Sequence, residues 1–237
     1  MNAWDGGLPA VIFVTGTDTD VGKTIGTAAL ASMLAGAGRS VVAYKPAQTG
    51  SAPGDPGDMG VVAHLAGVPT REGCRLLAPM APRAAAALES TRLPSLAQHL
   101  DAIERLRRAH DHVLVEGSGG LLVELTDAGD TLATLAAGVD AGAVVVVVRA
   151  ALGTLNHTML TREALTRRQI VQLGLIVGAW PARPGPVERS NLELLGQLRE
   201  GVVGVLPERA ADLEPEVFRA ASAGWLTGLA RGTWHPG

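Results

Sequence analysis

Short runs of β-branched residues alternate along this chain with longer stretches rich in Ala and Leu. Most runs are continuously apolar, which is typical of strands buried on both faces of a parallel sheet. They predict strands at Val11–Thr15, Ser40–Tyr44, His112–Glu116, Ala143–Arg149, Gly174–Gly178 and Val202–Leu206. The intervening stretches predict helices near Gly22–Ala37, Asp58–Ala66, Leu93–Ala109, Leu155–Gln169, Val187–Glu200 and Pro215–Leu229. This alternation predicts a doubly wound α/β fold with a mostly parallel sheet.

Two Pro- and Gly-rich segments, Ser51–Gly57 and Ala182–Pro186, interrupt the pattern without separating two complete ones. They predict loops rather than domain linkers. We therefore expect one domain over residues 1–237, with a core at about 10–207 and a C-terminal helix and tail at 208–237. Ligands of open parallel sheets bind beyond the carboxyl ends of the strands, so motifs at those ends are the candidate site.

Composition narrows the possible partners. The net charge is −3 and no long run of one sign occurs, which argues against a nucleic-acid groove or a basic membrane-binding face. The apolar stretch Ala141–Val148 is far shorter than the ~20 residues that span a bilayer, and the first residues lack a signal-peptide pattern. The single cysteine, Cys74, cannot form an internal disulfide. We expect a cytoplasmic protein without nucleic-acid or membrane partners.

Lysine is rare in this chain. Only Lys23 and Lys45 accompany eighteen arginines, so generic surface cations are supplied by arginine. A lysine here indicates a position that needs a compact point charge rather than a planar fork. Both lysines lie inside motifs.

The first motif runs from Gly16 to Thr24 and reads GTDTDVGKT, directly after a predicted strand and at the start of a helix. This is the context of a phosphate-binding P-loop, in which backbone N–H groups and the helix N-terminus face the phosphates. Lys23 is expected to reach the β- and γ-phosphates, and the Thr24 hydroxyl to ligate Mg²⁺. One departure is that Gly16 stands one residue before the usual first glycine position, which Thr17 occupies.

Two further motifs follow predicted strands: KPAQTG from Lys45 to Gly50, and VEGSGG from Val115 to Gly120. A carboxylate such as Glu116 at the end of a buried strand is costly unless it is paired or binds a metal. Asp58 follows the first of these motifs, where it can be either a helix N-cap or a metal ligand. Thr24, Asp58 and Glu116 together are hard oxygen ligands of the kind that Mg²⁺ prefers.

These motifs together resemble dethiobiotin synthetases. The resemblance covers GTDTDVGKT, KPAQTG, Asp58, VEGSGGLLVEL and the later LGTLNH from Leu152 to His157, and extends from about Val11 to Pro207. It implies a P-loop nucleotide-hydrolase fold. It also implies an ATP- or NTP-dependent ligase of biotin biosynthesis, whose small-molecule substrates are 7,8-diaminopelargonate and CO₂. In that family one amine becomes a carbamate, whose oxygen attacks the γ-phosphate, and the second amine then closes the ring.

The resemblance also implies residue roles. Lys45 and Lys23 are the catalytic lysines, and Thr19, Lys45, Thr49 and Asn156 contact the substrate. The implied nucleotide contacts are Thr19, Asp20, Val21, Gly22, Lys23, Thr24, Ile25, Asp58, Glu116, Gly117, Ser118, Gly119, Gly178, Ala179, Pro207 and Glu208. Asn156 is expected to hold the substrate tail from the neighbouring subunit of a homodimer, although a helix N-cap is an equal alternative.

The chief departure from the family concerns the nucleotide base. The family often carries an adenine-reading Asn after the strand at Gly174–Gly178, whereas this chain has Ala179 followed by Trp180 and Pro181. We expect several triphosphates to support the reaction, with CTP a candidate for an equal or better substrate than ATP.

Three alternatives remain open. A partition- or positioning-type P-loop ATPase carries a signature lysine at the start of the P-loop, where this chain has Gly16 and Thr17. An amide-forming synthetase fused to a glutaminase needs a nucleophilic cysteine on a sharp turn, which the context of Cys74 does not provide. A non-catalytic nucleotide-binding module is disfavoured because all of the expected charged groups are present.

Overall fold

The computed structural model describes residues 7–230 and contains a seven-stranded sheet with the order β3-β2-β4-β1-β5-β6-β7. Every strand pair in it is parallel, which confirms the predicted α/β fold. The strands are β1 (Val11–Gly16), β2 (Val41–Gln48), β3 (Thr70–Arg75), β4 (His112–Gly120), β5 (Ala143–Val148), β6 (Val171–Trp180) and β7 (Val202–Pro207).

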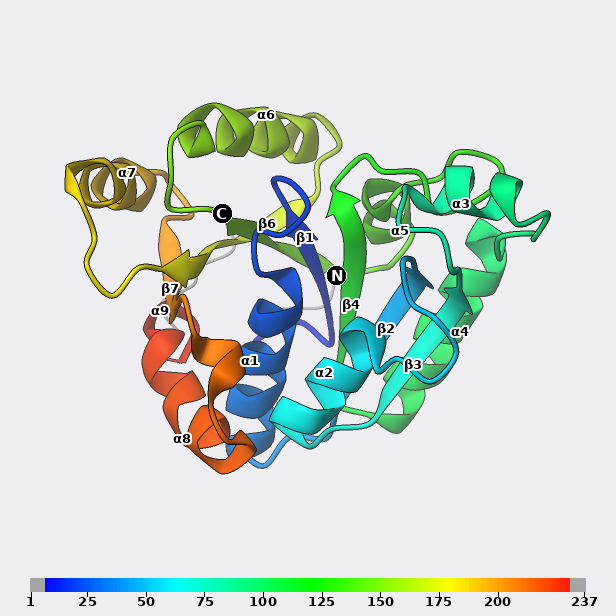
Figure 1. Cartoon of the computed structure of the whole chain (residues 1–237), viewed down its shortest axis with the longest axis horizontal. Coiled ribbons are helices and arrows are strands. Elements are labelled where there is room, and N and C mark those ends of the chain that lie inside the picture. Colours follow the sequence, from blue (N-terminus) through cyan, green and yellow to red (C-terminus); the bar gives the residue numbers. More distant parts are fainter. Residues whose placement is uncertain (1–6, 231–237) are drawn as a thin grey trace.

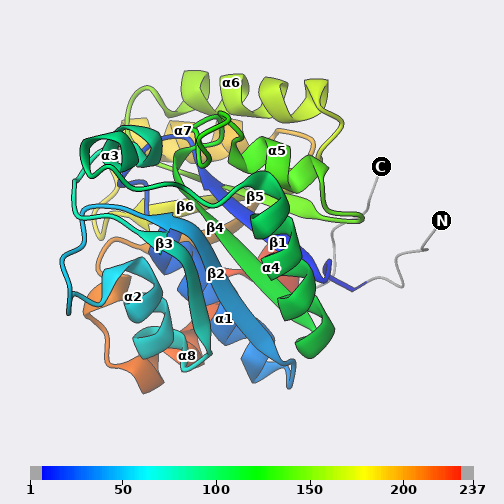
Figure 2. The same cartoon turned by 90° about the vertical axis from the view of Figure 1, so that its right-hand side faces the viewer.

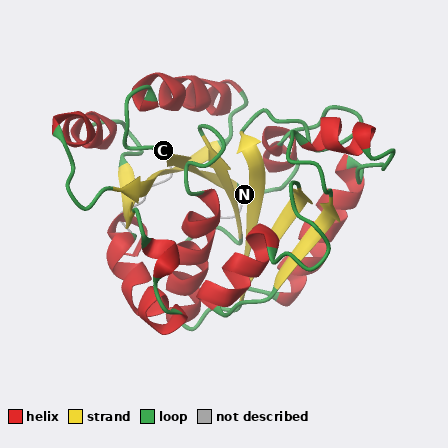
Figure 3. Ribbon diagram, in the orientation of Figure 1, coloured by secondary structure: helices red, strands yellow, loops and turns green. Residues whose placement is uncertain are grey.

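Helices cover both faces of the sheet (Figure 1). They are α1 (Lys23–Gly36), α2 (Gly57–Ala66), α3 (Pro82–Leu88), α4 (Leu96–Ala109), α5 (Leu132–Ala137), α6 (Thr154–Arg167), α7 (Pro186–Gly196), α8 (Pro215–Trp225) and α9 (Thr227–Ala230). A short 3-10 turn at Ala210–Asp212 precedes α8. One core cluster packs α1, α2 and α8 on one face, and a second packs α4, α5, α6 and α7 on the other. Figures 2 and 3 show the resulting three layers, with the strands between two sets of helices.

Three strands extend two or more residues past their predicted ends, two of them through polar residues or glycines that break the apolar pattern. β2 continues through Lys45 to Gln48, β4 continues to Gly120, and β6 covers residues 171–180. Pro46 lies inside β2, which is tolerated because pairing with β4 ends at Tyr44 and the missing N–H breaks no bond on that side. The lysine of the second motif therefore sits on a strand and not in a loop.

The sequence pattern missed three elements. β3 reads TREGCR and lies at the sheet edge, where charged side chains reach solvent and obscure a strand pattern. The short helices α3 and α5 are rich in Ala and carry no clear periodicity. The predicted C-terminal helix is divided at Leu226 into α8 and α9, and residues 231–237 of the predicted C-terminal helix and tail at 208–237 lie outside the described residues.

Within residues 7–230, no helix is both long and apolar enough to cross a membrane.

Candidate active site at the carboxyl ends of β1, β2 and β4

The P-loop connects β1 to α1 through a tight turn. A Cβ at Gly16 would come within 2.8 Å of the Asp18 carbonyl oxygen, so this glycine serves the turn although it stands one residue early. Gly22 adopts φ +94°, a left-handed conformation that favours glycine, at the N-cap of α1. The Nζ of Lys23 donates to the Asp18 carbonyl oxygen at 2.9 Å and thus lies over its own loop.

Gly178 of β6 packs directly against the backbone of the P-loop. A Cβ added to Gly178 would lie 2.0 Å from the Val21 carbonyl oxygen, and one added to Gly22 would lie 2.7 Å from the Gly178 carbonyl oxygen. The two backbones can approach this closely only because both positions are glycine. Gly178 therefore packs against the phosphate-binding loop, and its contact with the nucleotide stays a prediction.

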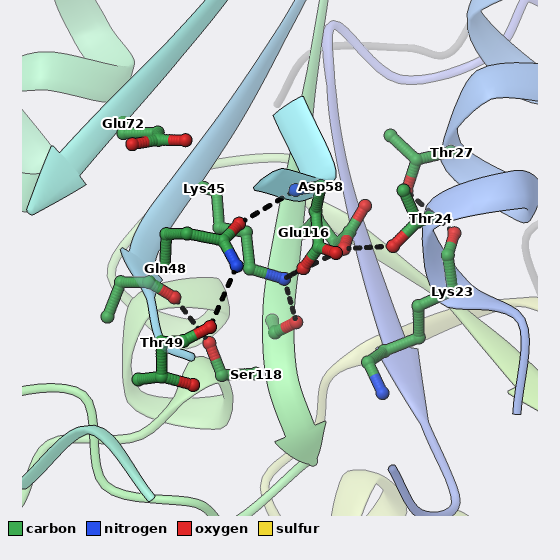
Figure 4. Close-up of polar contacts among 12 residues, drawn as sticks. Lys23, Thr24, Thr27, Lys45, Gln48, Thr49, Asp58, Glu72, Glu116 and Ser118 are labelled. Carbon is green, nitrogen blue, oxygen red and sulfur yellow. Dashed lines mark hydrogen bonds and ion pairs between the residues drawn. The ribbon is translucent and has the colours of Figure 1, made fainter. Parts of the chain in front are cut away.

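The Lys45 ammonium lies at the centre of a buried ionic cluster (Figure 4). Its Nζ is paired with the Asp58 carboxylate and with Glu116 Oε1 at 2.8 Å, and also contacts the Gly117 carbonyl oxygen at 3.4 Å. The Thr24 hydroxyl donates to the same Glu116 oxygen at 3.0 Å. Glu116 is completely buried and Lys45 is 3% exposed, whereas the Asp58 side chain is 36% exposed and reaches the cavity. Residues from four separate segments thus meet at one point.

The two lysines have opposite pKa shifts. Burial by itself lowers the pKa of Lys45, but the negative charges of Glu116 and Asp58 outweigh it, and the net shift is upward. The pKa of Lys23 is lowered, mainly by burial and next by the positive charge of Lys45. Because the charge of Lys45 affects the pKa of Lys23, the two ammonium groups are close enough to serve one site.

Asp58 is the second residue of α2 and does not cap the helix. The N-cap position belongs to Pro56, which makes no side-chain cap bond, so the N-cap alternative for Asp58 is wrong. The backbone N–H of Asp58 instead donates to the Gln48 Oε1 at 2.9 Å. The carboxylate is thereby directed toward Lys45, at the N-terminal end of α2, where the helix dipole favours a negative charge.

A cavity of about 770 Å³ lies above this cluster, beyond the carboxyl ends of the three strands. Most of the predicted site residues line it: Thr19, Asp20, Gly22, Lys23, Thr24, Lys45, Thr49, Asp58, Ser118 and Gly119. Glu116 lies directly beneath, joined to the wall through Lys45 and Thr24. The P-loop, KPAQTG and VEGSGG motifs, which are distant in sequence, therefore form one site.

Other predicted residues do not line this cavity. Val21 and Ile25 pack against the core cluster under α1, and Gly117 is buried in β4. Ala179, Pro207 and Glu208 are exposed at the ends of β6 and β7. There, the Glu208 N–H donates to the Trp180 carbonyl oxygen at 2.9 Å, and Trp180 is half-buried because it packs against the core cluster of the α4–α7 face.

The asparagines of the described chain do not replace the adenine-reading amide. Asn191 is buried and donates to the carbonyl oxygens of Ala150 and Ala151 at 2.8 and 3.2 Å. Asn156 is exposed on the first turn of α6, and does not line the cavity. The N-cap of α6 is Gly153, so the N-cap alternative for Asn156 is also wrong.

Sequence reasoning missed several wall residues. The segment Pro79–Pro82, Gly50 and Val123 line the cavity, and Gln48 and Arg75 hold the start of α2. Gln48 lies within a motif that the sequence had singled out, whereas Arg75 belongs to the unrecognised edge strand. The turn-rich APMAP sequence before α3 was the available signal for Pro79–Pro82.

The cluster is suited to a magnesium ion that is shared with a nucleotide. Among residues 7–230, no three His, Cys, Asp or Glu side chains are grouped so that they could hold a metal alone. However, Glu116 Oε2 is buried and has no hydrogen-bond partner in this part of the chain. Two carboxylates and one hydroxyl match the usual Mg²⁺ site, in which phosphate oxygens and water supply the other ligands.

Fold and site together define a P-loop nucleotide-binding protein, and structural comparison agrees on the fold. The chain superposes on the septum site-determining protein MinD of Pyrococcus horikoshii, solved with Mg-ADP, with a TM-score of 0.59 and 16% identity, covering 94% of this chain and 95% of the other. The cell division ATPase MinD of Pyrococcus furiosus gives a TM-score of 0.56 at 15% identity, over 94% and 98%. At such identities the likeness concerns the fold alone.

Sequence comparison gives the family. The family model described as "AAA domain" matches residues 10–216. The ATP-dependent dethiobiotin synthetase BioD of Mycobacterium avium is 51% identical over 93% of this chain and 99% of its own length. The enzyme of the same name from Streptomyces avermitilis is 46% identical over 95% of both. The chain belongs to the family of ATP-dependent dethiobiotin synthetases.

Proposed function

We propose that this chain is a cyclo-ligase that converts 7,8-diaminopelargonate, CO₂ and a nucleoside triphosphate into dethiobiotin, nucleoside diphosphate and phosphate, in biotin biosynthesis. The observation that carries this proposal is the meeting of Lys23 and Lys45 at one cavity, in a chain that belongs to this family. These are the only lysines of the chain, and both serve the same site.

The chemistry requires positive charge in a dry site. The carbamate formed from one amine and the γ-phosphate are both anions, and they repel each other as the carbamate oxygen attacks phosphorus. Lys45 is the group that contacts the carbamate, while Lys23 exchanges its bond to the Asp18 carbonyl oxygen for the phosphates. Phosphoryl transfer depends chiefly on such positioning and charge, so no base of unusual pKa is needed. The second amine then attacks the carboxyl carbon, and phosphate leaves with the former carbamate oxygen.

Thr24, Asp58 and Glu116 are the residues that would hold Mg²⁺, which supplies charge neutralisation to the triphosphate. Glu116 has two duties in this scheme, because one carboxylate oxygen fixes Lys45 and the other is available to the ion. Thr19 and Asp20 would border the nucleotide, and Thr49, which lines the same cavity, would contact the diamine.

Asn156 is assigned to contact with the site of a second subunit. It lies on α6 beside three exposed apolar side chains, Leu152, Met159 and Leu160, which are 77%, 50% and 57% exposed in the single chain. An apolar patch of this kind is typical of a homodimer interface, and Asn156 would then face the cavity of the partner. The homodimer, the cytoplasmic location and the single-domain boundaries at 1–237 remain predictions.

The rival functions have weaker support. The likeness to MinD concerns the fold, and the P-loop start at Gly16 and Thr17 lacks the signature lysine of positioning ATPases. A glutaminase-type nucleophile is also disfavoured, since burial raises the pKa of the Cys74 thiol to about 11. A thiol of that pKa is almost wholly protonated at neutral pH.

The test is a reaction with 7,8-diaminopelargonate, bicarbonate, Mg²⁺ and ATP or CTP, with the product identified by mass. We expect dethiobiotin and one phosphate per product molecule. Phosphate release that is independent of the diamine, without a ureido product, would instead favour a switching ATPase.

A further inference from the structure

Besides its internal bond from the Ala52 N–H to Asp55 Oδ2 at 2.8 Å, the turn that precedes α2 is bound at both ends by one arginine. Arg75, the last residue of β3, forms a two-bond fork with Glu72, from Nε to Oε2 at 2.9 Å and from Nη2 to Oε1 at 2.6 Å. Its Nη1 donates to the Ser51 hydroxyl and to the Asp55 carbonyl oxygen, both at 2.7 Å, and its Nη2 reaches the Pro56 carbonyl oxygen at 3.4 Å. One guanidinium thus connects a strand to both ends of the Ser51–Pro56 segment.

The same arginine is paired in register with Gln48 on the adjacent strand β2. The first residue of α2, Gly57, lies between the two side chains: a Cβ there would come within 2.9 Å of Arg75 Nη2 and 3.1 Å of the Gln48 amide. Gln48 accepts the next N–H, that of Asp58, at 2.9 Å. Side chains from the neighbouring strands β2 and β3 therefore both contact the N-terminal end of α2, directly before Asp58.

We propose that Arg75 is a positioning residue, which acts through Asp58 by fixing the end of α2 so that the carboxylate meets Lys45 and the Mg²⁺-nucleotide. This inference rests on the proposed function, since that function assigns Asp58 to the metal. Asp58 needs such support because its side chain is 36% exposed, whereas the Glu116 side chain is locked in the core at 0%. Arg75 supplies rigidity where burial does not.

The sign of the effect separates positioning from simple electrostatics. Arg75 is a cation close to a cation site, and its removal also leaves Glu72 unpaired. On charge alone, Arg75→Gln should therefore tighten the binding of a divalent ion. If Arg75 orients Asp58, the same substitution weakens it.

The experiment measures the affinity of the protein for MnATP and for metal-free ATP, with EDTA, by calorimetry in the absence of the diamine. The dissociation constant for metal-free ATP divided by that for MnATP gives the contribution of the metal. Loss of a residue that orients a metal ligand typically costs ~10-fold or more, so we expect this ratio to fall about tenfold in Arg75→Gln. Arg75→Lys keeps the charge but cannot make the fork, and should lie between that variant and the wild type.

A double-substitution cycle makes the test specific. Asp58→Asn should lower the ratio, and Arg75→Gln should add nothing in the Asp58→Asn background, because the two residues act as one unit. The matched control is Arg107→Gln, which removes an equivalent fork to Glu104 three residues earlier, at 2.7 and 3.0 Å, on the distant helix α4. It should leave the ratio unchanged.

Tighter MnATP binding in Arg75→Gln, an unchanged ratio, or additive losses in the double variant would each overturn the inference. An Asp58→Asn protein with the wild-type ratio would do the same, since no metal-directed carboxylate would then need positioning. These measurements do not depend on product formation. A wild-type protein that shows the expected ratios but makes no dethiobiotin would refute the proposed function and leave the role of Arg75 standing.

Discussion

The centre of this site and the predicted base region at the ends of β6 and β7, outside the cavity, are built very differently. At the centre, Lys45 is 3% exposed and is bonded to groups from α2 and β4, next to the P-loop. In the predicted base region, Ala179, Pro207 and Glu208 are exposed and are connected mainly by backbone bonds. In the proposed reaction the centre would handle phosphate and carbamate, which every turnover shares, and the region at the ends of β6 and β7 would distinguish the base.

This difference predicts where substitutions should be tolerated and where they should not. Buried charges tolerate little change, because each is costly to leave unpaired and each fixes its neighbours. We expect the exposed region around Ala179, which lacks a side-chain amide, to discriminate weakly among bases. Substitutions at the centre should therefore abolish turnover, and changes in the predicted base region should alter only the preference among nucleotides.

The largest effect is expected for Lys45→Arg. The charge is kept, but a planar guanidinium does not fit the space between Glu116 and Asp58, and it would displace the carbamate by about an ångström. A misplacement of that size can lower turnover ~10²-fold. Steady-state kinetics with the diamine would measure it, and thermal unfolding would verify folding. Near-normal kinetics would exclude close contact between Lys45 and the reacting groups.

Glu116→Gln should come next. The amide keeps the size but removes the anionic oxygen that is available to Mg²⁺, and it weakens the bond to Lys45. We expect the Mg²⁺ concentration for half-maximal rate to rise by roughly 10-fold or more, with a smaller change in KM for the diamine. A Mg²⁺ titration of the initial rate tests this. An unchanged Mg²⁺ requirement would make Glu116 a purely structural residue.

Gly178→Ala tests the support of the P-loop. The new methyl group would lie 2.0 Å from the Val21 carbonyl oxygen, so the loop must move. Overpacking of this kind costs ~1–3 kcal/mol, which predicts roughly 10-fold weaker binding of every triphosphate. Gly196→Ala is the control, because a Cβ there meets nothing within 4 Å. If nucleotide affinity is unchanged in Gly178→Ala, the backbone contact does not set the loop.

The smallest effect concerns the base. ATP, GTP, CTP and UTP should all support the reaction, with CTP equal to or better than ATP in kcat/KM. Loss of a base-reading hydrogen bond removes ~1–3 kcal/mol of preference, so Ala179→Asn should shift the ratio of kcat/KM toward ATP by about 10-fold. Were ATP preferred more than about a hundredfold in the wild type, another group would be reading adenine.

The sequence predicted that the motifs at the centre meet, because these motifs are short and local and contain residues whose chemistry has one simple interpretation. A GKT sequence after a strand, two isolated lysines and a buried Glu116 all pointed to the same edge of the sheet. The edge strand β3 was missed because its charged residues hide the strand pattern, and Arg75 was missed with it. The proposed role of Arg75 depends on its register with Gln48, which no local pattern reveals.

Long-range backbone approach was equally hidden. Gly178 was expected among the nucleotide contacts, but its close approach to Val21 and Gly22 of the P-loop could not be foreseen, because it depends on how β6 packs against this loop in the folded chain. For the same reason, the N-cap alternatives for Asp58 and Asn156 could be settled only by the structure, because Pro56 and Gly153 occupy the cap positions.

The central claim is that a carbamate oxygen attacks the γ-phosphate at Lys45. The most direct measurement is the reaction with ¹⁸O-labelled bicarbonate in unlabelled water, followed by mass analysis of the released phosphate. The proposed mechanism transfers one oxygen from the carboxyl group to each phosphate and retains the other as the ring carbonyl, so singly labelled phosphate should form in step with dethiobiotin. Unlabelled phosphate formed together with dethiobiotin whose ring carbonyl carries the label would mean that water, and not the carbamate, attacks the nucleotide, and the account would be wrong.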